Sequence, residues 1–237
     1  MHATVVVFPG SNADAEMVHT LRDVVQVRTS VAWHRDAELP AETELVAIPG
    51  GFSYGDYLRC GAIAKVSPIV RAIRRHAERG GYVLGVCNGF QILTEAGLLP
   101  GALTQNTHLR FECRDVFVTP VGSGPFTDGL PRVLRLPIAH ADGRYQAAPE
   151  VLAALERDAN LALRYCDASG EVTPAATPNG SIASIAGIYG GPAKNVFGLM
   201  PHPERISEPL LGGADGRALF DAVIRAASSA RSAKSAS

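Results

Sequence analysis

Residues 82–96, YVLGVCNGFQILTEA, decide the fold, because they indicate a buried strand that turns into a helix at one cysteine. Residues 82–86 are an apolar run of strand length, and residues 88–96 carry the apolar spacing of a helix. Between them, residues 85–89 have the pattern Gly-x-Cys-x-Gly, with Cys87 at the junction. A strand, a sharp turn and a helix around such a residue form a nucleophile elbow, here with cysteine as the nucleophile.

The predicted elbow makes Cys87 a candidate nucleophile. The free amides and the positive dipole end of the following helix favour the thiolate, which is the reactive form of cysteine. The same amides can hold an oxyanion, so the backbone N–H of Asn88 is a candidate donor. A buried cysteine on a core strand is the competing interpretation, since free cysteine often acts as a small hydrophobic residue. A partner base elsewhere in the chain decides between the two.

Outward from the elbow, apolar strands alternate with helices. This order predicts βαβ units and a parallel sheet, whose strands are buried on both faces and therefore apolar without alternation. In the first half, strands are expected at 4–8, 25–32, 45–48 and 82–86, and helices at 14–24, 68–79 and 88–96. In the second half, strands are expected at 111–119, 133–137, 161–166, 181–188 and 196–200, with a hairpin turn at Asn179-Gly180 and a closing helix at 216–227. The fold class is α/β, with a mostly parallel central sheet flanked by helices and extra β elements in the second half.

Length and composition limit the organisation and the class of protein. The 237 residues suit one large α/β domain, which we place at 1–227, and the small polar residues of 228–237 predict a disordered tail. A formal net charge of −1 gives no indication of nucleic-acid binding, and no apolar run is long enough to span a membrane. None of the four cysteines forms a CxxC pair and no secretion signal is evident, so reduced thiols in the cytoplasm are expected.

Residues 200–204, Met-Pro-His-Pro-Glu, supply a candidate base and its orienting group. The two prolines hold His202 in extended backbone, and residues two apart in an extended segment lie on one side. Glu204 can therefore contact one imidazole nitrogen of His202 and leave the other free as a base. A surface turn with an incidental ion pair is the competing interpretation. Together with the elbow, this pair gives a triad in the order Cys, His, Glu.

Residues 49–53, Pro-Gly-Gly-Phe-Ser, end a strand expected to neighbour the elbow strand. Two glycines let the backbone approach a ligand closely and direct its N–H groups toward it. The amides of Gly51 and Phe52 are therefore expected to complete an oxyanion hole with Asn88. A plain turn is the competing interpretation.

Several of these motifs together resemble a known family. The sequence GVCNGFQIL around Cys87 and MPHPE around His202 are similar to those of the class I (triad) glutamine amidotransferases, which have a flavodoxin-like fold. Within that class, four further stretches resemble the glutaminase subunits of phosphoribosylformylglycinamidine synthase. These are GGFSYGDYLRCGAIAK at 50–65, NTHLRFECR at 106–114, PNGSIASIAGI at 178–188 and GLMPHPER at 198–205. The resemblance covers nearly the whole chain apart from about the last ten residues.

The resemblance implies a role for each matching residue. Cys87 would be the nucleophile, His202 the general acid and base, and Glu204 its orienting group. Gln91, one turn into the elbow helix, would lie near the bound glutamine, although it suits equally well a helix-packing polar residue. The chain would hydrolyse glutamine and pass the ammonia to a synthetase for ATP-dependent formation of formylglycinamidine ribonucleotide in purine biosynthesis.

The partners implied are a large synthetase subunit and a small bridging subunit. This sequence has no GxxxxGK[ST] motif and no cluster of acidic residues suited to magnesium and ATP. No metal or cofactor is therefore expected on this chain, and ATP and Mg²⁺ are expected on the synthetase. Three alternatives stay open: a glutaminase serving another acceptor, a non-catalytic scaffolding relative, and a cysteine peptidase or chaperone-like relative with the same elbow.

Overall fold

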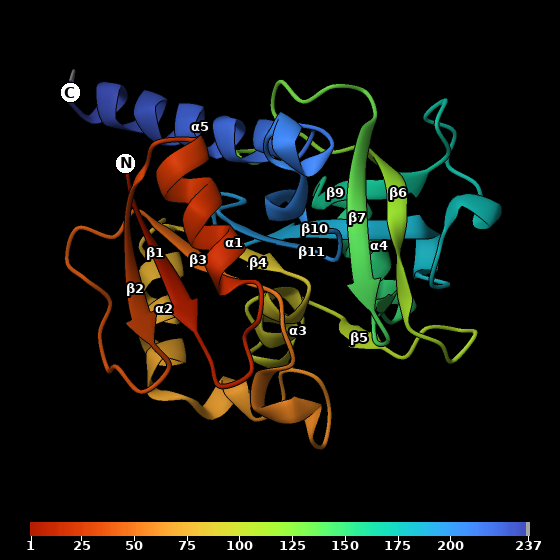
Figure 1. Cartoon of the computed structure of the whole chain (residues 1–237), viewed down its shortest axis with the longest axis horizontal. Helices are drawn as coiled ribbons and strands as arrows, with labels where there is room; N and C mark the ends of the chain where they lie inside the picture. The colour runs from red at the N-terminus through yellow and green to blue at the C-terminus, as the bar shows by residue number, and fades with distance from the viewer. Residues whose placement is uncertain (236–237) are drawn as a thin grey trace.

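A computed structural model describes the backbone of residues 1–235 and the side chains of residues 1–230. In this part of the chain, nine strands form one mixed sheet in the order β2-β1-β3-β4-β11-β10-β9-β6-β7 (Figure 1). The strands are β1 (His2–Val7), β2 (Arg28–Trp33), β3 (Leu45–Ile48), β4 (Tyr82–Val86), β6 (Glu112–Pro120), β7 (Leu134–His140), β9 (Leu161–Cys166), β10 (Ile185–Gly190) and β11 (Val196–Leu199). A second, two-stranded sheet pairs β5 (Ala102–Thr104) with β8 (Arg144–Gln146).

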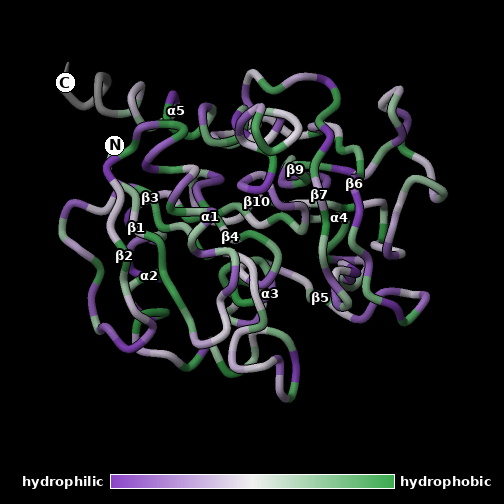
Figure 2. Tube along the Cα trace, in the orientation of Figure 1, coloured by the Kyte–Doolittle hydropathy of each residue, from purple (hydrophilic) through white to green (hydrophobic). Residues whose placement is uncertain are grey.

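The sheet changes character at β11. The pairings from β2 through β1, β3 and β4 to β11 are parallel, and those from β11 through β10, β9 and β6 to β7 are antiparallel. The predicted α/β class, with a parallel core and extra β elements in the second half, is confirmed. Strand β3 is buried along its whole length, as expected for a strand covered on both faces. Figure 2 shows the hydrophobic residues gathered along these inner strands and the hydrophilic ones along the outer loops.

The α-helices are α1 (Asp14–His19), which continues into the π-helical turn η1 (Thr20–Val24), α2 (Pro68–Glu78), α3 (Asn88–Glu95), α4 (Pro149–Arg157) and α5 (Arg217–Ser235). Within the described residues, every α-helix except α4, which follows β8, comes after a strand of the parallel half of the sheet. Figure 1 shows α1 in front of the parallel strands and α2 behind them. No helix of residues 1–235 is long and apolar enough to cross a membrane.

Three features differ from the sequence prediction. Helix α5 continues to Ser235, through most of the segment expected as a disordered tail, and residues 236–237 lie outside the described residues. Asn179-Gly180 is not a hairpin turn. It lies within the long connection between β9 and β10, where the Asn179 side chain donates to the Gly143 carbonyl at 2.7 Å. Helix α4 and strands β5 and β8 were not predicted; β5 and β8 are only three residues long, whereas α4 was missed despite its nine residues.

Strand register places three loops together at one edge of the sheet. In the pairing of β4 with β11, Val86 lies opposite Leu199, so the two strands end side by side. In the pairing of β3 with β4, Ile48 lies opposite Gly85. The segments that follow β3, β4 and β11 therefore meet, and they carry the loop at 49–53, Cys87 and His202. The carboxyl edge of a parallel sheet is the usual place for a ligand site in such folds.

Candidate active site

Cys87 forms the predicted elbow between β4 and α3. Its backbone has φ 51° and ψ −105°, a conformation that a residue with a side chain adopts only under strain. The glycines on either side are required by close packing. A Cβ atom added at Gly89 would lie 2.1 Å from the Ile48 carbonyl oxygen, and one at Gly85 would lie 2.5 Å from Leu93 Cδ1. These contacts explain the Gly-x-Cys-x-Gly pattern, because only glycines let α3 approach β3 and β4 this closely.

His202 and Glu204 form the predicted pair after β11. His202 Nδ1 lies 2.5 Å from Glu204 Oε1, and both side chains are buried, with 2% and 0% exposed. His202 directly precedes the short 3-10 helix η6 (Pro203–Ile206), and Glu204 is the second residue of that helix. The Nε2 atom of His202 is buried and has no hydrogen-bond partner among the described residues, so it is available to a reacting group. The structure therefore gives the pair the orientation of an imidazole held by a carboxylate.

Gly50 lies against both Cys87 and His202. A Cβ atom built on Gly50 would lie 2.5 Å from His202 Cε1 and 3.4 Å from Cys87 Cβ. Cys87 and His202 therefore contact the same glycine from neighbouring loops. Cys87 Sγ also faces the carbonyl of Ala139, at 3.8 Å, on the edge strand β7. The structure brings the two sequence-predicted groups to one buried position.

The charges of this cluster favour the imidazolium form of His202. Burial opposes a charge on the ring, but the charges of Glu204 and Cys87 outweigh it and raise the pKa of His202 to about 10. A protonated imidazole beside the sulfur can donate its proton to a leaving group, and cysteine attacks a carbonyl carbon as the thiolate. Cys87 and His202 can therefore act as a nucleophile and a proton donor at one position.

The segment 49–53 only partly matches the predicted oxyanion loop. The amide of Phe52 donates to the Gly10 carbonyl at 2.9 Å, because residues 10–12 pair with residues 50–52, so Phe52 is not a free donor in this structure. The Gly51 amide has no partner among the described residues, which keeps Gly51 as a candidate. The Asn88 amide opens α3, where a helix lacks its own acceptors, and the Asn88 side-chain Oδ1 accepts from the Ser53 amide at 3.2 Å.

Gln91 is buried in a hydrogen-bond network. Its Oε1 accepts from Asn88 Nδ2 at 2.8 Å, and its Nε2 donates to the Asp142 carbonyl at 2.7 Å. Asp142 Oδ2 in turn accepts from the Cys60 thiol at 3.0 Å. Gln91 thus joins α3 to the turn after β7, as the packing interpretation expects, and its contact with glutamine stays a prediction. Asp142 was missed, because nothing in its local sequence marks a partner 51 residues away.

His140 is a further residue near the site that the sequence analysis missed. Its ring is 3% exposed, and neither ring nitrogen has a hydrogen-bond partner among the described residues. Burial, with the nearby His202, lowers the pKa of His140 to about 4, so the ring stays neutral. The ring lies over Gly143, where an added Cβ atom would be 2.3 Å from ring atoms. No spacing motif marks His140, since it reaches the site only through sheet pairing.

An elbow cysteine on an α/β sheet, next to a buried histidine–glutamate pair on the neighbouring loop, defines the triad class of glutamine amidotransferases. The model of the CobB/CobQ-like glutamine amidotransferase domain matches residues 1–212. The chain belongs to this family, in the branch of the phosphoribosylformylglycinamidine synthase subunit PurQ.

Similar proteins place the chain in that branch along nearly its whole length. It is 52% identical over 231 residues to phosphoribosylformylglycinamidine synthase subunit PurQ of Rhodospirillum rubrum, covering 96% of this chain and 100% of that one. It is 48% identical to the PurQ subunit of Gloeobacter violaceus, covering 96% and 98%. The solved structure of PurLQS from Thermotoga maritima matches with a TM-score of 0.82 and 42% identity, covering 94% of this chain and 97% of that chain.

Proposed function

We propose that this chain is the glutaminase subunit of phosphoribosylformylglycinamidine synthase, and that Cys87, His202 and Glu204 are its catalytic triad. The observation that carries the proposal is the meeting of the elbow thiol with the buried His202–Glu204 pair at the ends of β4 and β11. The similarity to PurQ subunits along nearly the whole chain supports the particular synthase.

In the first half of the reaction, the Cys87 thiolate attacks the side-chain amide carbon of glutamine. The carbonyl oxygen becomes an oxyanion, which the backbone amides of Asn88 and Gly51 stabilise as hydrogen-bond donors. His202, protonated at the start, gives its proton to the amide nitrogen. The C–N bond breaks, ammonia leaves, and a γ-glutamyl thioester remains on the sulfur.

In the second half, His202 is neutral and takes a proton from water, which attacks the thioester carbon. The C–S bond breaks, glutamate leaves and the ion pair of thiolate and imidazolium is restored. Glu204 accepts from the Nδ1 proton throughout, which keeps the Nε2 atom as the one that exchanges protons with the reacting groups. The net reaction is glutamine plus water to glutamate plus ammonia.

The ammonia passes to an acceptor on a partner subunit. Free in water at neutral pH it would be mostly protonated and not nucleophilic, so direct transfer is required. We place ATP, Mg²⁺ and formylglycinamide ribonucleotide on a large synthetase subunit, with a small bridging subunit between. The solved structure of PurLQS from Thermotoga maritima, with a 42% identical chain, supports the presence of partner subunits.

Residues 1–227 form the glutamine amidotransferase domain in this proposal, and the site of action is the cytoplasm.

The four cysteines are free thiols, as is usual in a reducing compartment. Cys60 and Cys166 are buried, and burial raises the pKa of both thiols. Cys60 and Cys166 therefore have structural roles in this proposal, and the exposed Cys113 is given the same role from the sequence alone.

A reconstituted complex with the synthetase and bridging subunits tests the proposal. With amide-labelled [15N]glutamine, formylglycinamide ribonucleotide and ATP, we expect label in the amidine product only when this chain is present. Ammonium salt should support synthesis without it. Label in a different acceptor would identify another amidotransferase, and peptide cleavage without glutamine hydrolysis would identify a peptidase-like relative. Equal use of glutamine with and without the chain would leave it a scaffold.

A further inference from the structure

The Glu204 carboxylate is held by few direct contacts. Its Oε1 accepts from His202 and lies 4.0 Å from Nε of Arg205. Its Oε2 is buried and has no hydrogen-bond partner among the described residues. Since Oε2 accepts no hydrogen bond from the side chains that the structure describes, the position of the carboxylate depends on the backbone of η6 that carries it.

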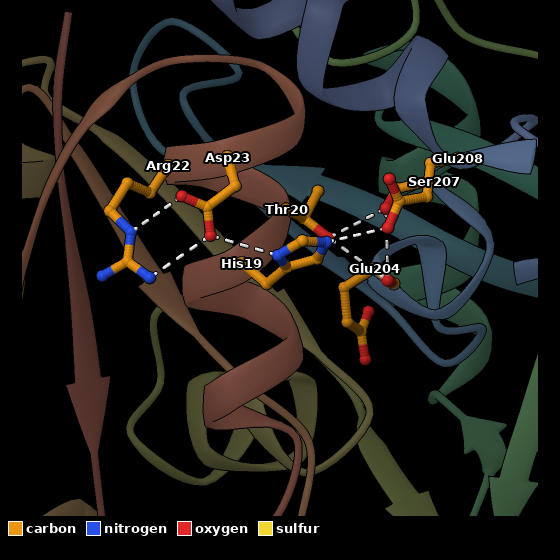
Figure 3. A network of polar contacts seen from close by, with 7 residues as sticks. All are labelled: His19, Thr20, Arg22, Asp23, Glu204, Ser207 and Glu208. Atoms are coloured by element: carbon orange, nitrogen blue, oxygen red, sulfur yellow. Dashed lines mark hydrogen bonds and ion pairs between the residues drawn. The ribbon is translucent and has the colours of Figure 1, made fainter. Parts of the chain in front are cut away.

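That backbone is held by two buried hydroxyl groups (Figure 3). The Glu204 carbonyl oxygen accepts from Thr20 Oγ1 at 3.2 Å and from Ser207 Oγ at 3.4 Å, and the two hydroxyl oxygens lie 3.0 Å apart. All three residues are completely buried, with 0% exposed. Hydrogen bonds in such surroundings are not exchanged for water, and an unpaired group there is costly.

Thr20 comes from the opposite end of the chain, 184 residues before Glu204. It is the first residue of the π-helical turn η1, in which the Val25 amide donates to the Thr20 carbonyl at 2.9 Å. A π-helical turn is rare, and such turns frequently occur at functional sites. Thr20 directly follows the last residue of α1, and its side chain points toward Glu204 and Ser207 (Figure 3).

We propose that Thr20 and Ser207 are positioning residues of the triad, which fix the backbone of Glu204 so that its carboxylate meets His202. The inference rests on the proposed glutaminase function. Neither residue touches glutamine or the reacting atoms. Their effect passes through Glu204 to the orientation and proton affinity of His202, and therefore to the chemical step rather than to glutamine binding.

The same pair of segments offers a matched control. His19 Nε2 lies 2.8 Å from Glu208 Oε1, so it joins the same helix to the same loop. This link is near the surface, with 45% of the His19 side chain exposed, and it ends on a side chain outside the triad. If tying α1 to this loop were all that mattered, loss of either link would have a similar effect.

The test compares Thr20→Val, Thr20→Ser and His19→Gln in the reconstituted complex. Valine has the shape of threonine without the hydroxyl, and serine keeps the hydroxyl without the methyl. We expect Thr20→Val to lower kcat for glutamine hydrolysis roughly tenfold, with KM for glutamine within about twofold, because misplacement of a catalytic group acts on the chemical step. Synthesis from ammonium salt should not change. Thr20→Ser and His19→Gln should stay within about twofold of the unaltered chain.

Thermal unfolding separates positioning from folding. Thr20→Ser loses a buried methyl group and should melt at a lower temperature, yet keep its kcat. The positioning role would be overturned if kcat fell in Thr20→Ser in proportion to its lower melting temperature, although the hydroxyl is kept. A normal kcat in Thr20→Val would overturn it as well. Failure of the unaltered chain to use glutamine would instead sink the proposed function and the inference with it.

Discussion

Replacing Glu204 with glutamine removes the negative charge of the proposed triad carboxylate and keeps the size and shape of its side chain. The amide oxygen of glutamine can still accept from His202 Nδ1, so the contact that measures 2.5 Å keeps a partner and only the negative charge is lost. Both side chains are buried, so neither solvent nor salt replaces that charge. A hydrogen bond to a charged group contributes about 1.5–3 kcal/mol and a neutral one about 0.5–1.5 kcal/mol, so losing the charge alone costs about 1–1.5 kcal/mol, which corresponds to a fall in kcat of roughly 5- to 13-fold.

The pH profile of Glu204→Gln should change as well. In the unaltered protein, the charges of Glu204 and Cys87 hold the pKa of His202 above its usual range, at about 10, against the effect of burial. Removing one of these charges lowers this pKa, so the imidazolium loses its proton at a lower pH. The alkaline limb of kcat/KM should therefore move to lower pH.

The assay is glutamate release by the reconstituted complex between pH 6 and pH 10. Glu208→Gln is the control, since it removes a carboxylate from the neighbouring turn that pairs with the partly exposed His19. That variant should keep kcat within about twofold, as expected for a solvent-exposed ion pair. A Glu204→Gln variant with unchanged kcat and an unmoved alkaline limb would refute the role given to the carboxylate.

Three further predictions follow from close contacts at the site. Gly50→Ala should lower glutamine hydrolysis more than tenfold, measured as kcat, because the new methyl group would lie 2.5 Å from His202 Cε1; unchanged kcat would contradict the geometry. Gly89→Ala should destabilise the protein by about 1–3 kcal/mol in urea unfolding, because its Cβ would lie 2.1 Å from a carbonyl oxygen of β3, and an unshifted midpoint would contradict this. Cys60→Ala should lower the unfolding free energy by about 1–3 kcal/mol through the lost hydrogen bond to Asp142, and Cys60→Ser should recover part of it.

The elbow and the residues of the proposed triad were predictable because short sequence motifs mark each of them. Gly-x-Cys-x-Gly between an apolar run and a helical pattern places Cys87 without knowledge of the rest of the chain. Met-Pro-His-Pro-Glu marks the His202–Glu204 pair, although the predicted extended segment was wrong: His202 leads into the 3-10 helix η6, and that turn brings Glu204 onto the ring. Strands β3, β4 and β9 have the predicted bounds, since buried parallel and central strands are continuous apolar runs.

What was not predicted depends on contacts between distant segments. The amide of Phe52 is occupied because residues 10–12 pair with its loop, which no local pattern announces. The side chain of Gln91 is satisfied by a carbonyl 51 residues away, and the backbone of Glu204 by Thr20 across 184 residues. The Asn179-Gly180 pair has the composition of a hairpin turn, yet tertiary hydrogen bonds to Gly143 place it in a longer connection.

The most direct measurement of the central claim is synthesis by the complex carrying Cys87→Ala, with each nitrogen source in turn. In the proposed mechanism, the sulfur of Cys87, which lies with His202 against Gly50, is the group that glutamine requires and ammonia does not. We therefore predict no detectable amidine formation from glutamine, together with an undiminished rate from ammonium salt. Glutamine-dependent synthesis that survives the loss of this thiol would contradict the account.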